Sequence, residues 1–169
     1  VFPKRLCSSV TASFSNNSLD VSGQINQSHG LTTNPSGTRM FIADRTSARV
    51  YRYDFNTGFD ISTASFSSVS FDASQQDTSL EGIAFNSTGT KMFLDGSEND
   101  KVYQYDLTTA YDITTATFTG KSFLTVPTFS SRPLGFTFNN AGTRLFVVAE
   151  SPNSVFQFNL GTPFDISTI

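Results

Sequence analysis

The side chains suited to chemistry are carboxylates, amides, guanidinium groups and a single imidazole, that of His29, in polar segments between apolar runs. Carboxylates and amides bind hydroxyl groups, guanidinium groups bind anions, and neighbouring aromatic rings cover apolar C–H faces. This combination suits the recognition of a sugar. The candidate ligand-binding residues are Gln24, His29, Asp44, Arg45, Gln76, Glu81, Asp95, Glu98, Asn99, Arg132, Glu150 and Asn153.

Catalysis has weaker support in the sequence. A nucleophilic mechanism needs a base that is held by an acid and reaches a serine. His29 is the only histidine and no nucleophile motif accompanies it, so we interpret it as a residue of a surface loop. One histidine and one cysteine also argue against a zinc site. We therefore expect no enzymatic activity, no catalytic residues, no metal and no cofactor.

A cation site near Glu81 is a further alternative. Glu81 and Asp77 precede the same apolar segment, and they are candidates to supply oxygen ligands to a cation, as a gluconolactonase-like hydrolase would need. The counterpart of Glu81 is His29 in one repeat and Leu134 in another. The repeats therefore give this oxygen cage no support.

A sequence repeat positions these residues. The segment at 11–14 recurs at 63–66 and 115–118, at intervals of 52 residues, and four other landmarks recur in the same register. Such a repeat is the signature of a repeat architecture. The other landmarks begin at Gly30, Gly82 and Gly135; at Asn34, Asn86 and Asn139; at Val50, Val102 and Val155; and at Phe59, Tyr111 and Phe164.

Each repeat unit predicts four β-strands. In the second unit, strands are expected at 83–85, 91–94, 102–107 and 118–123, the first two joined by a turn at 86–89 in which Gly89 takes a positive φ. Along 102–107, Tyr103 and Tyr105 should face one side and Val102 and Gln104 the other. The last strand is the most polar and suits an exposed edge. No segment has convincing helical periodicity.

Four strands in a unit of about 52 residues predict an all-β fold, a β-propeller with three four-stranded blades. We divide the chain into an N-terminal segment at 1–10, an outer strand and loop at 11–29, and repeats at 30–81, 82–134 and 135–169. The last repeat lacks its outer strand, and we expect the N-terminal strand to complete the last blade. Propellers have roughly four to eight blades, so we expect a six-bladed ring from two chains, or a higher even-numbered homo-oligomer. The alternative is half of a longer protein.

Residues 30–55, 82–107 and 135–160 resemble the repeats of YVTN- and NHL-like propellers, in which an Asn-x-x-Gly-Thr turn precedes a Val-Tyr-x-Tyr-Asp strand. The resemblance implies a propeller fold and says little about function. In size and organisation the chain is also similar to small secreted propeller lectins, including those of invertebrates.

The candidate residues share one face of the predicted propeller. Turns between the first and second strands and between the third and fourth recur almost unchanged, whereas the loops on the opposite face vary and hold the candidates. Binding residues concentrate on such loops. We therefore predict a multivalent lectin for glycans or glycoproteins, with N-acetylated hexosamines as the expected sugars. The alternatives are a structural or protein-interaction scaffold and, third, a lactonase-type hydrolase.

Composition bears on partners and location. The chain has 14 acidic and 11 basic residues, which argues against binding to nucleic acid, and no apolar run is long enough for membrane insertion. Because the sequence begins with Val1 and contains sequons at Asn16, Asn26 and Asn86, we interpret it as a processed or excised chain and expect a secreted protein. The lone Cys7 excludes an internal disulfide.

Overall fold

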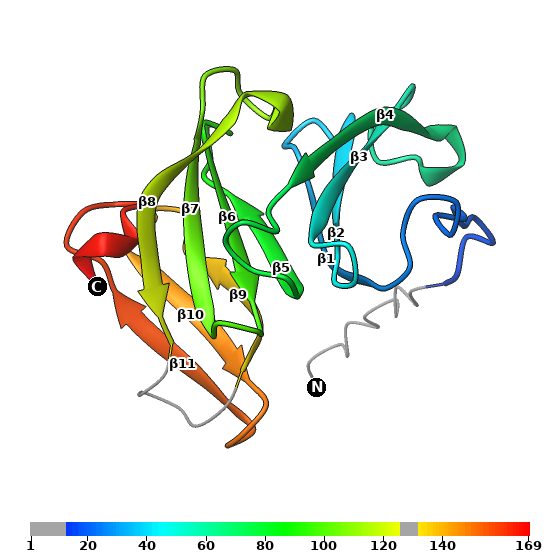
Figure 1. The fold of residues 1–169 in the computed structure, drawn as a ribbon. Helices are drawn as coiled ribbons and strands as arrows, with labels where there is room; N and C mark the ends of the chain where they lie inside the picture. The colour runs from blue at the N-terminus through cyan, green and yellow to red at the C-terminus, as the bar shows by residue number, and fades with distance from the viewer. Residues whose placement is uncertain (1–12, 126–131) are drawn as a thin grey trace, which may run out of the picture.

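The computed structural model describes residues 13–125 and 132–169 (Figure 1). The predicted segment at 1–10 with Cys7, and the start of the expected first strand at 11–12, lie outside the described residues. One short 3-10 helix follows the third strand of each sheet, at Ile61–Thr63, Ile113–Thr115 and Ile166–Thr168. The strands are β1 (Ser28–Thr33), β2 (Arg39–Asp44), β3 (Arg49–Phe55), β4 (Ala64–Asp72), β5 (Leu80–Phe85), β6 (Lys91–Gly96), β7 (Lys101–Leu107), β8 (Ala116–Leu124), β9 (Pro133–Phe138), β10 (Arg144–Ala149) and β11 (Ser154–Asn159).

The strands form three separate antiparallel sheets, which we call the first, second and third blades. Their strand orders are β1-β2-β3-β4, β5-β6-β7-β8 and β9-β10-β11. The inner strands β1, β5 and β9 lie next to one another, and the blades fan out from them (Figure 1). The prediction of an all-β protein built from propeller blades is confirmed. Within the described residues, no helix is long and apolar enough to cross a membrane.

Glycine at the inner strands permits this close approach. A Cβ on Gly30 would lie 2.6 Å from the Cα atom of Gly82, so β1 and β5 meet backbone to backbone. Both residues belong to one repeated sequence landmark. Only glycine leaves enough room at this contact.

The repeated turns form as predicted. Asn86 Oδ1 accepts a hydrogen bond from the Lys91 backbone N–H at 3.0 Å, and Gly89 has a φ of +71°. After each third strand, an aspartate caps a short 3-10 turn; in the second blade, Asp112 accepts the N–H of Thr114 at 3.1 Å. Local hydrogen bonds therefore explain these recurring residues, without a metal ligand role.

Packing between blades supplies the core. Tyr103 and Tyr105 of β7 face the first blade, and Val102 faces the third, as the alternating pattern predicts. Aromatic rings connect neighbouring blades: Phe41 lies 4.8 Å from Phe85, and Phe93 lies 4.6 Å from Phe138, centroid to centroid. This packing accounts for much of the phenylalanine content.

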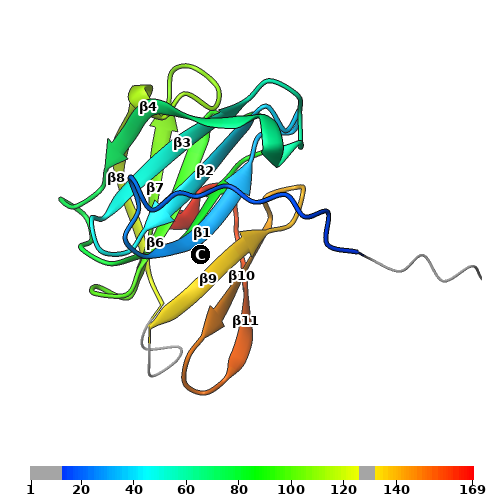
Figure 2. The same cartoon turned by 90° about the vertical axis from the view of Figure 1, so that its right-hand side faces the viewer.

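The third blade has only three described strands, and β11 is its outer edge (Figure 2). Residues 13–27 form no strand, so the N-terminal segment does not complete the third blade of its own chain. Instead, Leu19 and Val21 pack on the first blade, against a cluster that includes Tyr53. The expected pairing of this segment with β11 would need a second chain, and it stays a prediction.

Candidate functional site

His29 and Glu81 meet at the N-terminal ends of two neighbouring inner strands. They occupy equivalent repeat positions, the second residue of β1 and of β5. His29 Nδ1 lies 2.6 Å from Glu81 Oε2; the Glu81 side chain is 1 % exposed and the His29 side chain 35 %. A buried carboxylate therefore holds a histidine that still reaches the surface. The expectation that His29 belongs to a surface loop is wrong, because His29 lies on strand β1.

Two more polar side chains contact Glu81. Arg45, in the loop after β2, places Nε 3.2 Å from Glu81 Oε1 and donates to Ser79 Oγ at 3.0 Å. Ser97 Oγ donates to Glu81 Oε1 at 2.7 Å. Both carboxylate oxygens are thus engaged, which offsets the cost of burying the Glu81 side chain. We call His29, Arg45, Glu81 and Ser97 the inner cluster.

The third blade carries an ion pair between Arg132 and Glu150. Arg132 Nε lies 2.9 Å from Glu150 Oε2, and a second guanidinium nitrogen lies 3.1 Å from Oε1. The hydrogen bonds that Arg132 donates to Glu150, together with the negative charges of Glu150 and Glu81, raise the pKa of Arg132. Arg132 is therefore held by Glu150.

Asp95 is a buried carboxylate on the other side of Glu81. It is fully buried on β6, and neither of its oxygens has a hydrogen-bond partner among the described residues. Burial, with the nearby charge of Glu81, raises the pKa of Asp95 to about 7. The backbone N–H groups of Gly82 and Asp95 offset part of this rise in the pKa of Asp95, although neither forms a hydrogen bond of good geometry with the carboxylate. Asp95 is closed off from ligands, so its predicted role in binding is not supported.

Two other aspartates hold the variable loops together. Asp44 accepts hydrogen bonds from Ser47 Oγ at 2.8 Å and from the Gln27 N–H at 3.0 Å. Burial raises the pKa of Asp44, but these bonds outweigh burial and leave it below its ordinary value. Asp77 accepts the N–H groups of Ser79 at 3.0 Å and Asn99 at 3.1 Å. Both aspartates have structural roles.

An oxygen cage around a cation does not form from these residues. Asp77 is occupied by loop amides and Glu81 by the inner cluster, and no three His, Cys, Asp or Glu side chains of residues 13–125 and 132–169 group as metal ligands would. The available donors therefore do not fit a calcium ion, which prefers six to eight oxygens.

The remaining predicted residues stabilise loops or lie at the open edge. Gln24 and Gln76 accept hydrogen bonds from the hydroxyl groups of Tyr53 and Tyr105, both at 3.2 Å. The backbone N–H of Glu98 donates to Asp77 at 3.3 Å, and Asn99 Nδ2 donates to the Gln76 carbonyl at 3.0 Å. Asn153 lines a shallow hollow with Leu134 and Val148, away from the inner cluster.

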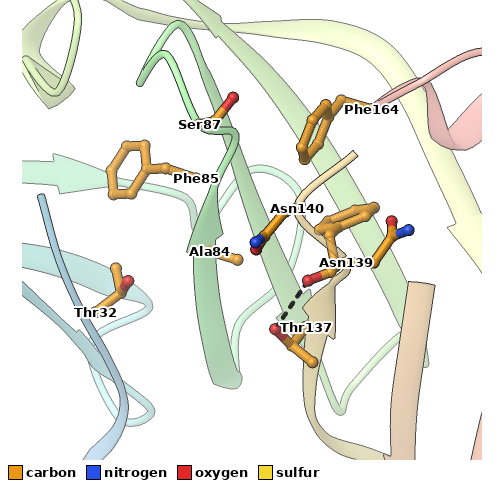
Figure 3. A pocket seen from close by; sticks show the side chains of 9 residues that line it. Thr32, Ala84, Phe85, Ser87, Thr137, Asn139, Asn140 and Phe164 are labelled. Carbon is orange, nitrogen blue, oxygen red and sulfur yellow. Dashed lines mark hydrogen bonds between the residues drawn. The ribbon is translucent and has the colours of Figure 1, made fainter. Parts of the chain in front are cut away.

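A separate cavity of about 230 Å³ lies at the opposite ends of the inner strands (Figure 3). Its walls hold no titratable side chain. Asn139, in its wall, is committed to the turn, since Asn139 Oδ1 accepts the Thr143 N–H at 2.9 Å. The cavity therefore offers shape without acid–base chemistry. The lining residues are Thr32, Ala84, Phe85, Ser87, Thr137, Phe138, Asn139, Asn140 and Phe164.

Ser79 and Ser97 are the residues of the site that sequence reasoning missed. Ser97 is the repeat counterpart of Arg45, and Ser79 is the counterpart of Arg132. The repeat alignment could therefore have indicated both serines, because each aligns with an arginine that was a candidate binding residue. Serine is common in this chain, so its type alone did not draw attention.

Comparison with known proteins finds similarity only among solved structures; no family model and no curated protein sequence matches the chain. A "putative 6-phosphogluconolactonase" of Bacteroides fragilis is 17% identical, with a TM-score of 0.60 over 83% of this chain and 36% of its own. A luciferin-regenerating enzyme is 16% identical, with a TM-score of 0.57 over 82% of this chain and 47% of the enzyme. The β-propeller domain of Cps50 (Swd1) from Myceliophteria thermophila is 9% identical, with a TM-score of 0.54 over 79% of this chain and 38% of that domain's chain.

These findings correct the expected function. The expectation of a non-enzymatic lectin or scaffold is contradicted, because similar structures bear the names of a lactonase and a luciferin-regenerating enzyme. The physical reason is that several of the proposed sugar-binding side chains are buried or bound to loop amides, and that His29 and Glu81 contact each other. The chain spans less than half the length of the structures it matches, and at these identities the similarity shows the fold: three blades of a β-propeller.

Proposed function

We propose that the protein is a hydrolase-type propeller that opens a lactone or related ester at the inner cluster. The contact of His29 Nδ1 with buried Glu81 Oε2, at 2.6 Å, carries this proposal. A carboxylate that orients an imidazole through Nδ1 leaves Nε2 to accept a proton, as a general base requires. The names of the similar structures favour the same class of reaction.

The proposed reaction needs only water and the ester. His29 Nε2 takes a proton from water, and the hydroxide forms a bond to the carbonyl carbon. Glu81 stabilises the resulting imidazolium, and the Arg45 guanidinium, which contacts the same carboxylate, stabilises the oxyanion. When the ring C–O bond breaks, the leaving oxygen takes the proton back from His29, and the product is a hydroxy acid.

Two arginine side chains suit an anionic substrate or product. Arg45 lies at the end of the first blade and Arg132 at the end of the third, and both are partly exposed, with side-chain exposures of 30% and 34%. A guanidinium binds carboxylate or phosphate in a fixed geometry. We therefore infer a substrate class of small lactones, including those that carry an acidic group.

A lactonase assay tests the proposal. Hydrolysis of glucono-δ-lactone is measured as the acid released at constant pH, and the spontaneous rate is subtracted. His29→Gln and Glu81→Gln should each lower kcat roughly 100-fold or more, because both remove general-base catalysis. Ser28→Ala, on the exposed residue before His29, should keep the full rate.

Two results would refute this mechanism. One is an absence of hydrolysis above the spontaneous rate in the unaltered protein. The other is a requirement for calcium, tested with EDTA and with added calcium, because the mechanism assigns no step to a metal.

Two further proposals concern kinship and location. We propose that the repeats are of the YVTN- or NHL-like type, because Asn34, Asn86 and Asn139 form the same turn in the three blades. We also propose that the protein is secreted, which the sequon at exposed Asn26 supports weakly.

A further inference from the structure

Two apolar surfaces of the molecule lack the cover that the same repeat positions have elsewhere. Val155 of β11 is 66% exposed, whereas its counterparts Val50 and Val102 are fully buried between blades. On the other side of the molecule, Leu31 of β1 is 60% exposed, whereas its counterpart Ile83 is 6% exposed. The two exposed residues lie on opposite outer faces, one on the third blade and one on the first.

The joint between the first and second blades shows what such surfaces bind. Phe41 and Val50 of the first blade pack against Met92 and Tyr105 of the second in one buried cluster. The corresponding positions of the third and first blades are also apolar, and on the first blade Met40, Ile42 and Tyr53 are already buried in a cluster with Leu19 and Val21. On the third blade they are Phe146, Val148 and Val155; on the first blade they are Leu31, Met40, Ile42, Tyr51, Tyr53, Phe55 and Ile61.

The N-terminal segment already occupies the place of an outer strand from a preceding blade. Leu19 is the repeat counterpart of Phe71, which belongs to the outer strand β4 and lies 5.2 Å from the Tyr105 ring of the next blade. Leu19 packs in the same way against the cluster that contains Tyr53, the counterpart of Tyr105. The segment therefore packs on the first blade as the outer strand β4 packs on the second blade. It takes the position of the outer strand of a blade that would precede the first.

A hydrogen bond between the first and second blades joins residues whose counterparts in the other repeats are exposed. Arg39 of the first blade donates through Nη1 to the Tyr111 carbonyl of the second at 3.1 Å. The counterpart of Arg39 is Arg144, which is exposed on the third blade, and the counterpart of Tyr111 is Phe59, which is 68% exposed on the first. A further joint of the same kind would bring Arg144 to the Phe59 carbonyl.

We propose that the third blade of one copy docks on the first blade of a second copy, whose residues 14–21 add the missing strand to β11. The sheets predict the register, since Val50 lies opposite Phe71 and Val102 opposite Phe123. By the same spacing, Val155 lies opposite Leu19 of the second copy. Phe14, which is 75% exposed, then lies opposite Phe158.

A second copy is the occupant because each chain carries both surfaces and the strand that joins them. Two copies give six blades, within the roughly four to eight of known propellers, and two identical joints close the ring. The closed ring would surround one channel with two inner clusters. This inference stands without the proposed hydrolase activity, because it uses none of the residues of the inner cluster.

Mass in solution tests the closed ring. Light scattering coupled to size exclusion should give twice the 18.4 kDa of one chain. Val155→Asp should weaken the dimer roughly tenfold or more, since it places a charge in the joint. Ser122→Asp, at an exposed position of the second blade, should leave the dimer intact. An 18.4 kDa monomer, or a mass that grows without a dimer plateau, would overturn the proposal.

Cross-linking tests the register independently. In a background with Cys7→Ser, the double variant Leu19→Cys, Val155→Cys should oxidise to a covalent dimer, and mixing two differently tagged copies should give a mixed product. Asp20→Cys with Val155→Cys is the matched control, because residue 20 faces the other side of the strand. A cross-link within one chain, or equal dimer yields from both pairs, would contradict the proposed pairing.

Discussion

Asp77 fills, in the second blade, the space that a side chain at position 96 would need, because a Cβ on Gly96 would overlap the Asp77 carboxylate. In the first blade the arrangement is reversed. Asp44 stands at the counterpart of Gly96, and buried Ile25 stands at the counterpart of Asp77. In each of these two blades one carboxylate therefore holds the variable loops: Asp44 of strand β2 in the first blade and Asp77 of the loop before β5 in the second.

Gly96→Ala should lower the free energy of unfolding by about 1–3 kcal/mol, the usual effect of overpacking. Gly23→Ala is the matched control, since a Cβ at Gly23 meets nothing within 4 Å. Chemical denaturation of both variants measures the difference. The double variant Asp77→Ile, Gly96→Asp reproduces the first blade and should be more stable than Gly96→Asp alone. If Gly96→Ala is neutral, the close contact with Asp77 is not as described.

Asp95 should make the protein less stable at neutral than at acidic pH. Because its pKa is raised to about 7 in the folded state, the folded protein binds the proton more tightly than the unfolded chain. Stability from this group is fully present below about pH 4 and is lost as the pH rises to about 7, on the order of 4 kcal/mol in total.

Asp95→Val tests this pH dependence, because the repeat counterparts Ala43 and Val148 show that the position accepts an apolar residue. The variant should melt at a higher temperature than the unaltered protein at pH 8 and show little gain at pH 4. Asp106→Asn, at an exposed carboxylate, serves as the control. An equal gain at both pH values would contradict burial of an unpaired charge.

Gly89 should be intolerant of any side chain. It has a φ of +71°, and a Cβ there would overlap the Tyr111 ring. Gly89→Ala should therefore cost about 3 kcal/mol, from backbone strain and displacement of the ring, and Gly89→Val should cost more. Gly120→Ala isolates the strain, because Gly120 has a φ of +79° and open space around it, and should cost about 1 kcal/mol. Equal losses would show that the ring contact contributes nothing.

Asn86 should act as a turn residue and carry no glycan. It is 8% exposed, and Nδ2 donates to Thr88 at 3.0 Å and to Thr90 at 3.2 Å. Asn86→Ala should cost about 1–3 kcal/mol, because it leaves buried groups of the turn unpaired. Asn26→Ala, at an exposed sequon, should be nearly neutral. Peptide mapping after expression in a glycosylating host should find Asn86 unmodified, and a glycan there would disprove its burial.

Much of the fold could be predicted from the sequence because its causes are local. The turn at Asn86 and Gly89 depends on side chains within five residues of each other, and the alternation of Val102 and Tyr103 reflects the period of a strand. The repeat then transferred each local prediction to three blades. The positions of these strands followed from residues that are close together in the chain, although β5 begins at Leu80 rather than at the predicted Ile83.

The candidate site was predictable only as a set of residues on one face. Tertiary structure decided which of them meet, because His29 and Glu81 lie 52 residues apart and touch only where two inner strands converge. The repeat alignment set these two residues at equivalent positions, which does not reveal that neighbouring blades bring them together.

The sequence by itself determined the β-blade, its turns and its repetition, since each depends on short-range hydrogen bonding and periodic burial. Only the tertiary structure decided that Asp95 is buried without a partner, that Asp77 holds a loop, and that Leu19 packs on the first blade. The physical reason is that the direction and solvent exposure of a polar side chain depend on the packing of other blades, which no local pattern encodes.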